Sequence, residues 1–259
     1  MLLKKKIVSN GTRHQLNIKK FLLCKKPKIV KTLLKGKNKV CGRGLLLGKI
    51  TVRHRGGGCK NLYRKLMFSQ EINYSIVIAH VYDPLRTSFL VLCFNFLTKK
   101  FYNTISTNFT YPGTLISYFL TYPELRLGSF SSIKNIPLGS IIHSLFYKDK
   151  VQYVKSAGVY AILLQIDNNF CKIKLPSGTI KKFKLDTHCI IGTVSNTLHN
   201  STILGKAGRA RLKNKRPHVR GVAMNPVDHP HGGQTSGGVP SVTPWGIPTK
   251  GKPTRKKNK

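Results

Sequence analysis

Short apolar runs rich in Ile, Val, Leu, Tyr and Phe alternate with Gly, Pro, Asn and Asp between Lys49 and Lys184. Runs of this length, bounded by turn residues, are typical of β-strands. The pattern predicts two sets of strands: first 50–52, 62–68, 74–82, 89–94 and 100–104, then 139–147, 157–165, 170–175, 179–185 and 190–194. The pattern lacks the long helical crossovers that parallel strands need, so we expect a mainly β chain with two small closed or nearly closed barrels.

The periodicity disappears after Gly205, where Gly, Pro, Lys and Arg dominate. Such a segment cannot bury a core of its own, so we expect it to be disordered or threaded through a partner. Residues 225–233, Asn-Pro-Val-Asp-His-Pro-His-Gly-Gly, combine Pro-fixed and Gly-permissive backbone, which favours one extended path. The lone Trp245, between Pro244 and Gly246, is not typical of a linker.

Positive charge is concentrated at the two ends of the chain. The 259 residues hold 46 Lys and Arg against 7 Asp and Glu, a formal net charge of +39. Residues 1–65 carry +20, residues 66–204 carry +7 and residues 205–259 carry +12, with Asp228 as the single acid of the last segment. A compact chain with this charge repels itself, so we expect a polyanion, and nucleic acid before an anionic membrane, as its partner.

The sequence offers little evidence for a disulfide framework or a membrane span. Six cysteines (Cys24, Cys41, Cys59, Cys93, Cys171 and Cys189) are widely spaced without a C-x-x-C pair, which favours free thiols in a reducing compartment. The longest apolar stretch, 76–97, is interrupted by Asp83, Pro84 and Arg86, so no membrane span is expected.

Three stretches are specific enough to indicate a family. They are 48–60 (Gly-Lys-Ile-Thr-Val-Arg-His-Arg-Gly-Gly-Gly-Cys-Lys), 205–211 (Gly-Lys-Ala-Gly-Arg-Ala-Arg) and 216–233, which contains Val-Arg-Gly-Val-Ala-Met-Asn-Pro-Val-Asp-His-Pro-His-Gly-Gly. Weaker matches at 82–86, 135–140 and 156–158 stand in the expected order. Together they resemble the universal large-subunit ribosomal protein 2 family over nearly the whole chain.

That resemblance implies the domain organisation and the function. It implies a basic N-terminal arm (1–47), an oligonucleotide-binding-like barrel (48–121), an SH3-like barrel (122–204) and an extended basic tail threaded through RNA (205–259). The implied function is that of a structural, non-enzymatic constituent of the large ribosomal subunit. It would bind the subunit's ribosomal RNA and support assembly, subunit association and the peptidyl transferase region. Neighbouring ribosomal proteins, and small-subunit RNA at the subunit interface, are the other implied partners, and no small-molecule substrate is expected.

Chemistry and resemblance together indicate which residues bind RNA. Arg presents forked donors that match phosphate oxygens, and glycines allow close approach of the backbone. The expected RNA-binding residues are Arg53, His54, Arg55, Lys60, Arg64, Lys206, Arg209, Arg211, Lys215, Arg216, Arg220, Asn225, Asp228, His229, His231, Lys250, Lys252 and Arg255. The resemblance suggests that Asp228 holds His229 or a backbone amide in place. Cys59 stands where the family has His, and the loop after Gly233 is shortened.

Other interpretations of these residues remain open. Asp228 with His229 resembles part of a catalytic dyad, which a basic nuclease would use, and His229 with His231 offers two metal ligands. No nucleophile accompanies them and carboxylates are scarce, so neither catalysis nor a protein-bound metal or cofactor is expected, whereas Mg²⁺ carried by the RNA is left open. Charge alone would also suit a DNA-compacting protein. Tyr63, Phe68, Tyr82 and Phe94 are assigned to the core in preference to stacking on bases.

Residue usage bears on the compartment. Lys outnumbers Arg almost three to one, and Ile, Asn and Phe are abundant, as expected from A/T-rich codons. The family's early Gly-x-Arg-His feature stands at 11–14, which leaves little room for a targeting peptide. We therefore expect an organellar protein, in the mitochondrial matrix rather than in a plastid, because the middle of the chain has diverged so far.

Overall fold

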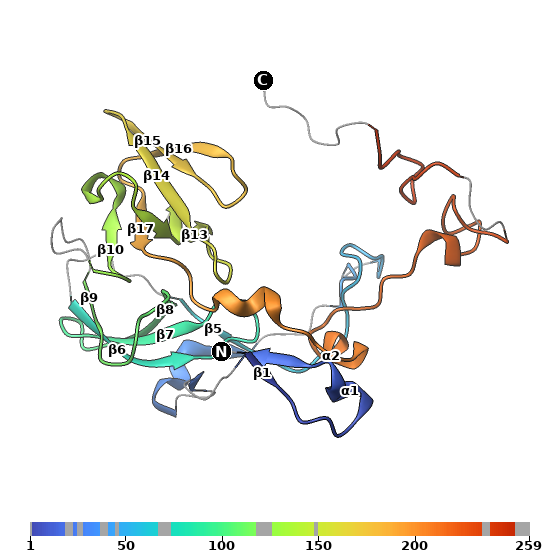
Figure 1. The fold of residues 1–259 in the computed structure, drawn as a ribbon, viewed down its shortest axis with the longest axis horizontal. Helices are drawn as coiled ribbons and strands as arrows, with labels where there is room; N and C mark the ends of the chain where they lie inside the picture. Colours follow the sequence, from blue (N-terminus) through green and yellow to red (C-terminus); the bar gives the residue numbers. More distant parts are fainter. Residues whose placement is uncertain are drawn as a thin grey trace. The chain divides into compact units, whose positions relative to one another are not determined.

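The computed structural model describes residues 2–18, 23–24, 28–36, 41–44, 47–66, 74–117, 126–147, 150–234 and 239–251. Within these ranges the chain is mainly β, with short helices (Figure 1). The strands are β1 Leu2–Lys4, β2 Leu16–Ile18, β3 Leu23–Cys24, β4 Leu34–Gly36, β5 Leu62–Arg64, β6 Tyr74–Val81, β7 Leu90–Asn95, β8 Phe101–Ile105, β9 Leu115–Ser117, β10 Phe130–Ser132, β11 Ile141–His143, β12 Leu145–Tyr147, β13 Lys150–Tyr153, β14 Ala161–Ile166, β15 Phe170–Lys174, β16 Ile180–Lys184 and β17 His188–Ile191. The α-helices are α1 Asn10–Arg13 and α2 Ala207–Leu212, and 3-10 turns occupy Lys28–Leu33, Ile133–Asn135, Thr197–Ser201 and Gly221–Ala223.

The chain divides into two compact units. The first unit comprises Met1–Asn38 and Lys60–Arg209, and the second comprises Lys39–Cys59 and Ala210–Lys259. The second unit therefore combines a stretch from the early chain with the C-terminal residues. The expected linear division at 47, 121 and 204 remains a prediction.

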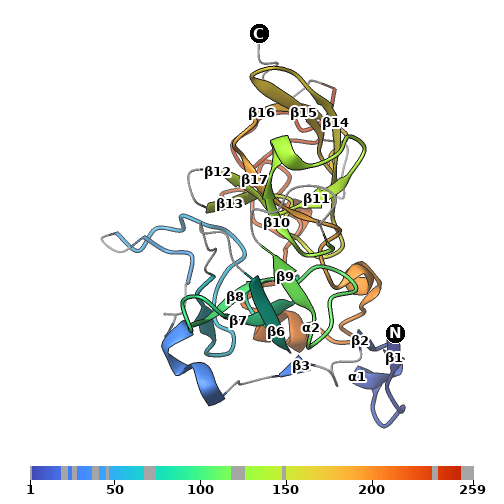
Figure 2. The same cartoon turned by 90° about the vertical axis from the view of Figure 1, so that its left-hand side faces the viewer.

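The first sheet of the first unit has the order β3-β6-β7-β8, with β9 also paired to β6. Strands β6, β7 and β8 form an antiparallel meander, which Figure 2 shows side by side with β9. The apolar run Leu90–Cys93 is buried along its whole length, so β7 is covered on both faces. The predicted strands 74–82, 89–94 and 100–104 correspond to β6, β7 and β8 within one residue at each end.

The second sheet of the first unit has the order β10-β17-β11-β14-β15-β16 and is antiparallel throughout. Residues 167–169, which lie between two predicted strands, join β14 to β15, and the Asp167 N–H donates to Phe170 O at 2.8 Å. Residues 176–178, between the next two predicted strands, join β15 to β16, with Gly178 at φ +82°. Strands β14, β15 and β16 form the yellow hairpins of Figure 1. Among the described residues β16 is an edge of this sheet.

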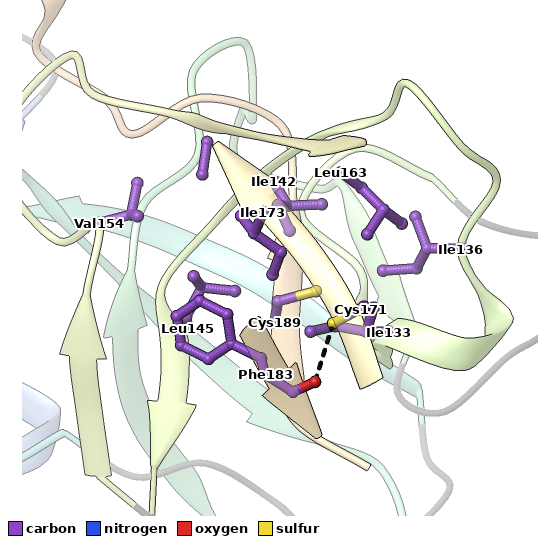
Figure 3. Close-up of a cluster of buried hydrophobic side chains, with 11 residues drawn as sticks. Ile133, Ile136, Ile142, Leu145, Val154, Leu163, Cys171, Ile173, Phe183 and Cys189 are labelled. Carbon is purple, nitrogen blue, oxygen red and sulfur yellow. Dashed lines mark hydrogen bonds between the residues drawn. The ribbon is translucent and has the colours of Figure 1, made fainter. Parts of the chain in front are cut away.

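Apolar side chains from both sheets make the core. In one cluster, Leu163, Ile173 and Phe183 of the second sheet gather with Leu145 of β12 (Figure 3). A second cluster joins the two sheets, since Val77, Val91 and Tyr102 share it with Phe130, Phe146 and Ile190. The first unit is therefore built around apolar contacts between segments far apart in the sequence.

Several local predictions are wrong. Residues 50–52 form no strand, and only Ile50 makes an isolated bridge, to Arg43. The expected strand 139–147 is interrupted at Ser144, whose φ of +52° separates β11 from β12. Residues 130–132, which lie between the two predicted sets of strands, form β10, which pairs with β17. Residues 67–68 of another predicted strand lie outside the described residues.

The basic ends carry local structure of their own. Strands β1 and β2 pair as a hairpin, and Leu16 bridges Ile203 within the first unit. The predicted extended tail instead begins with helix α2, followed by turns. In both places backbone hydrogen bonds are made despite the excess of positive charge.

Candidate nucleic-acid interface

Two cationic segments lie side by side in the second unit. The Gly56 N–H donates to the Asn214 side-chain oxygen at 2.8 Å, and the Cys59 N–H donates to Leu212 O at 3.0 Å. The Arg216 N–H donates to His54 O at 2.9 Å, and Arg55 forms a bridge with Lys215. Loop 47–59 and segment 210–220 are therefore joined by main-chain bonds, although more than 150 residues separate Gly56 from Asn214.

The glycine triplet makes this close approach feasible. Gly56, Gly57 and Gly58 have φ of +154°, +71° and +90°, a range that favours glycine. A Cβ on Gly58 would lie 2.9 Å from Asn214 N and 3.0 Å from Leu212 O, which is too close for any side chain. The triplet, expected from the sequence to approach phosphates, thus brings the loop against segment 210–220.

Aromatic and cationic side chains gather around this loop. The His54 and His218 rings stack with centroids 3.9 Å apart and an interplanar angle of 20°. The Arg53 guanidinium carbon lies 4.9 Å from the centre of the Trp245 ring. His54 adopts a left-handed φ of +59°, and all four side chains are exposed.

Arg209 and Arg211 of helix α2 differ from the other expected cations. Arg209 Nη1 donates to Leu204 O at 2.7 Å, and Arg211 Nη1 donates to Gly56 O at 3.3 Å and Lys215 O at 3.4 Å, so part of each guanidinium supports the backbone. The other expected cations that the structure describes, Arg64 apart, are exposed: Lys60 and Lys206 in the first unit, and Arg53, Arg55, Lys215, Arg216, Arg220 and Lys250 in the second. Their head groups are therefore available to phosphate oxygens. Lys252 and Arg255 lie outside the described residues.

His229 is buried beneath the 3-10 turn at Gly221–Ala223. Its relative exposure is 8%, and a Cβ on Gly221 would lie 2.6 Å from its ring. Its Nδ1 accepts the His231 N–H at 3.0 Å, while Asp228 and Asn225 are exposed. Among the described residues no side-chain bond of Asp228 to His229 is found, so the dyad that a nuclease would need is not formed.

His231 links residue 229 to the turn that follows. Its ring lies 4.7 Å from that of His229, and its Nε2 is 2.9 Å from Pro240 O and 3.2 Å from Val242 N. Because one nitrogen cannot donate to the carbonyl and accept from the amide at once, each ring tautomer serves one of these contacts. Both rings of the expected His pair are thus engaged with the protein itself.

Arg64 differs from the other expected RNA-binding residues. It is buried at 5% relative exposure, and its Nη1 lies 4.0 Å from the Asp83 carboxylate, which also pairs with Arg86. Burial lowers the pKa of the Arg64 guanidinium, and the Asp83 charge opposes that effect. The structure therefore places Arg64 in an internal ion-pair cluster, unlike exposed Lys60.

The aromatic residues assigned to the core occupy mixed positions. Phe94 packs against Phe101 with ring centroids 5.1 Å apart, and Tyr82 is half-buried. Tyr63 is exposed and faces Arg86, whose guanidinium lies 5.1 Å from the ring centre. Phe68 lies outside the described residues.

The described part of the chain contains no group of three or more metal-binding side chains, and none of its helices is long and apolar enough to cross a membrane. All six cysteines are free thiols. Burial raises the pKa of Cys93 to about 12 and also raises that of Cys189, which keeps both protonated. Cys93 and Cys189 are part of the core.

Charge in the second unit is almost entirely of one sign. Its residues 39–59 and 210–259 hold 16 Lys and Arg and a single acid, Asp228, for a net charge of +15. Exposed Arg and Lys heads together with exposed aromatic rings are the donor set that nucleic acids accept. A mainly β chain with this surface belongs to the class of nucleic-acid-binding proteins.

Comparison with known proteins identifies the family. Residues 30–117 match the model described as Ribosomal Proteins L2, RNA binding N-terminal domain, and residues 126–246 match Ribosomal Proteins L2, C-terminal domain. The chain is 43% identical to the large ribosomal subunit protein uL2 of Orientia tsutsugamushi (strain Ikeda) over 88% of its length and 85% of that protein. It is 42% identical to the large ribosomal subunit protein uL2m of Reclinomonas americana over 100% of its length and 95% of that protein. The uL2 of Rickettsia prowazekii (strain Madrid E) is 42% identical over 88% of this chain and 85% of its own.

This chain therefore belongs to the ribosomal protein L2 family, whose members are non-enzymatic, ribosomal-RNA-binding proteins of the large ribosomal subunit. The family resemblance seen in the sequence is confirmed, and the nuclease and DNA-compacting alternatives are not supported.

Two residues of this region were missing from the expected site. His218 stacks on His54, and Asn214 accepts the Gly56 N–H from a left-handed conformation with φ of +66°. The dipeptide Asn214-Lys215 within a basic run is a weak signal of a left-handed turn, since Asn tolerates that conformation. Nothing in the sequence indicates that His54 and His218 are neighbours.

Proposed function

We propose that the second unit is the main ribosomal-RNA-binding element of this chain and neutralises phosphates where RNA strands converge. One observation carries the proposal: loop 47–59 and segment 210–220 are held side by side by main-chain hydrogen bonds, with no acid in either segment. Two adjacent segments that carry only cationic side chains repel each other in water. A polyanion between or around them removes that repulsion and releases its own counterions, which favours binding.

The residues proposed to contact RNA are those whose head groups are exposed. They are Arg53, His54, Arg55, Lys60, Lys206, Lys215, Arg216, Arg220, Asn225, Asp228 and Lys250. Arg209 and Arg211 each keep donors beyond their backbone contacts, and Lys252 and Arg255 continue the same charge. We assign His229 and His231 to shaping the turn, because one ring nitrogen of each already contacts the protein.

Within the ribosome, this role extends to large-subunit assembly, association of the subunits and support of the peptidyl transferase region. Assembly requires that converging RNA strands be bridged, and bridging them requires no catalysis by the protein. Neighbouring ribosomal proteins and small-subunit RNA are the further partners proposed. Mg²⁺ ions accompanying the RNA would complement the lysines and arginines.

The finer architecture is also a proposal. We assign the sheet around β6, β7 and β8 to an oligonucleotide-binding-like barrel (48–121) and the sheet around β14, β15 and β16 to an SH3-like barrel (122–204). The antiparallel meanders and the short turns support this assignment. The basic segments 1–47 and 205–259 are the proposed extensions.

We further propose that the ribosome concerned is mitochondrial. The support is the Lys-, Ile-, Asn- and Phe-rich composition and the match to a uL2m protein over 100% of this chain. Bacterial relatives are similar to the same degree, so the deciding measurement is where a tagged chain is localised. Its recovery in plastid or bacterial ribosomes would contradict the proposal.

The central experiment compares two charge variants in ribosome assembly. Replacing Arg55, Lys215 and Arg216 together by Gln should lower recovery of the chain in sedimented large subunits and reduce the salt needed to release it, because fewer counterions are displaced. The matched control replaces Lys172, Lys182 and Lys184, which are cations of β15 and β16, by Gln. Equal loss from both variants would show that total charge, and not the second unit, determines binding.

A further inference from the structure

Trp245 lies at the tip of a tightly closed turn. The Gly246 N–H donates to Thr243 O at 2.9 Å, the Thr243 N–H donates to Ile247 O at 2.8 Å, and Gly246 has φ of +77°. A loop of three residues that ends in a left-handed glycine is a well-populated hairpin connection. Proline in the first loop position further restricts the backbone. The indole is therefore carried on a defined support.

The base of the turn is closed as well. The Thr249 N–H donates to Ser241 O at 2.9 Å, the Ser241 and Thr249 hydroxyls are 2.7 Å apart, and Val242 bridges Pro248. The His231 Nε2 contacts at Pro240 and Val242 anchor the start of the turn. None of these bonds involves the indole, since they use backbone groups, hydroxyls and the His231 imidazole, so the fold of the turn does not require the indole.

Residue Trp245 is nonetheless 71% exposed, although it is the only tryptophan of the chain. Among the described residues, the Arg53 guanidinium lies over one face of the indole, with its carbon 4.9 Å from the ring centre. A cation over one face polarises an aromatic ring and leaves the opposite face available for stacking. The arrangement is a flat apolar surface with a positive charge behind it.

Such a surface matches one chemical class of ligand. A nucleobase is planar and attached to a phosphate, so it fits an aromatic ring beside a guanidinium in a unit with a net charge of +15. Bases in RNA helices are stacked on their neighbours, so only an unpaired base can reach the indole. An apolar protein surface would gain from the ring but would have to desolvate the surrounding cations.

We infer that Trp245, backed by Arg53, is a stacking platform for an unpaired nucleobase of the RNA. The inference deepens the proposed RNA binding and rests on it. It adds to phosphate neutralisation a contact that depends on the base.

The sole tryptophan makes the inference directly measurable. The full chain is titrated with a single-stranded adenosine oligoribonucleotide, whose bases are unpaired, and with a strand of equal length that carries ribose phosphates without bases. Because stacking tolerates any base, no cognate sequence is needed. The base-containing strand should quench tryptophan fluorescence and shield the ring from acrylamide. The baseless strand should bind through charge yet leave both signals unchanged.

Variants separate stacking from charge. Trp245→Ala should weaken binding of the adenosine strand on the order of tenfold, Trp245→Phe should restore most of it, and neither should affect the baseless strand. The matched control is Ile247→Ala, because Ile247 is exposed at 58% in the same turn. Its affinity for both strands should equal that of the unaltered chain.

The possible failures are distinguishable. If neither strand binds at moderate salt, the proposed function fails. If both strands bind and the indole stays unquenched and accessible, RNA binding stands and the stacking platform is disproved. Equal weakening of both strands by Trp245→Ala would also overturn it, since that result indicates a damaged turn.

Discussion

Burial determines whether a cationic side chain of this chain supports the fold or is available to RNA. Arg64 and Lys60 are four positions apart and both follow the glycine triplet. Lys60 is exposed, whereas Arg64 lies beside the fully buried Asp83. A buried charge is retained only with a partner, so Arg64 is assigned to stability and Lys60 to RNA.

Two substitutions test this assignment. Arg64→Gln should lower the free energy of unfolding by about 2 kcal/mol, because Asp83 loses one of its two cations. Lys60→Gln should leave stability unchanged and weaken RNA binding, most strongly at low salt. Urea unfolding and filter binding of both variants provide the measurements. A stable Arg64→Gln chain with reduced RNA affinity would return Arg64 to the interface.

His143 should make stability depend on pH. It is fully buried between Thr107 Oγ1 and Ser144 Oγ, each 2.8 Å away, and burial lowers its pKa from 6.5 to about 3. Below about pH 6.5 the unfolded chain therefore binds a proton that the folded chain rejects. The stability present above that pH falls as the pH drops toward 3, by up to about 5 kcal/mol.

The pKa of His80 is also lowered by burial and contributes in the same direction. Urea unfolding of the full chain and of His143→Gln between about pH 7 and pH 4 measures the effect. The variant should show a shallower loss of stability. Parallel profiles for the two chains would contradict the assignment.

At the scale of elements, the loop with the glycine triplet depends on main-chain contacts that only glycine permits. Gly57 and Gly58 both have positive φ, but a Cβ on Gly57 would meet only Arg211 Nη2, at 3.6 Å, whereas one on Gly58 would meet the backbone of Leu212 and Asn214. The two positions therefore share conformational strain and differ in available space.

Gly58→Ala should separate loop 47–59 from segment 210–220, while Gly57→Ala should cost only about 1–2 kcal/mol of backbone strain. Limited proteolysis of the loop measures this difference, because cleavage follows the population of the open form. We expect cleavage of Gly58→Ala to be on the order of tenfold faster than that of Gly57→Ala. Equal rates would mean that the close approach does not hold the loop.

Strand prediction succeeded or failed for identifiable reasons. β15 and β16 were predicted because buried Cys171, Ile173 and Phe183 alternate with polar residues and a turn separates the strands. β10, with the sequence Phe-Ser-Ser, was missed because its polar residues are buried by pairing with β17 and carry no apolar pattern. Residues 50–52 have the composition of a strand but make only one isolated bridge, between Ile50 and Arg43.

At the scale of the whole molecule, the division into two units has a direct consequence for truncation. The first unit contains the described apolar clusters, and residues 210–259 contribute none of their members. Deletion of 210–259 should therefore leave a cooperatively unfolding chain with an unchanged β-type circular dichroism spectrum.

The same deletion removes Leu212, Asn214 and Arg216, the partners of loop 47–59. That loop should become rapidly cleaved by protease, and RNA affinity should fall steeply, since 11 Lys and Arg are lost. Circular dichroism, proteolysis and filter binding test the three expectations. A collapsed spectrum would show that the tail is required for the core.

The candidate site was only partly accessible to sequence reasoning. Its residue types followed from charge, glycine content and motif, because phosphate neutralisation depends mainly on the number of exposed cations. Burial of Arg64 and His229 did not follow, since both depend on contacts with residues 19 and 8 positions away, at Asp83 and Gly221. Trp245 was noticed but could not be paired with Arg53.

The sequence alone determined the mainly β character, the family and the cationic ends, because strand periodicity, motifs and net charge are local or additive properties of the chain. Only the tertiary structure decided that the glycine loop and the C-terminal segment form one unit, and which expected RNA-binding side chains are exposed. Those outcomes depend on contacts between distant segments, where steric fit and main-chain hydrogen bonds select the partner.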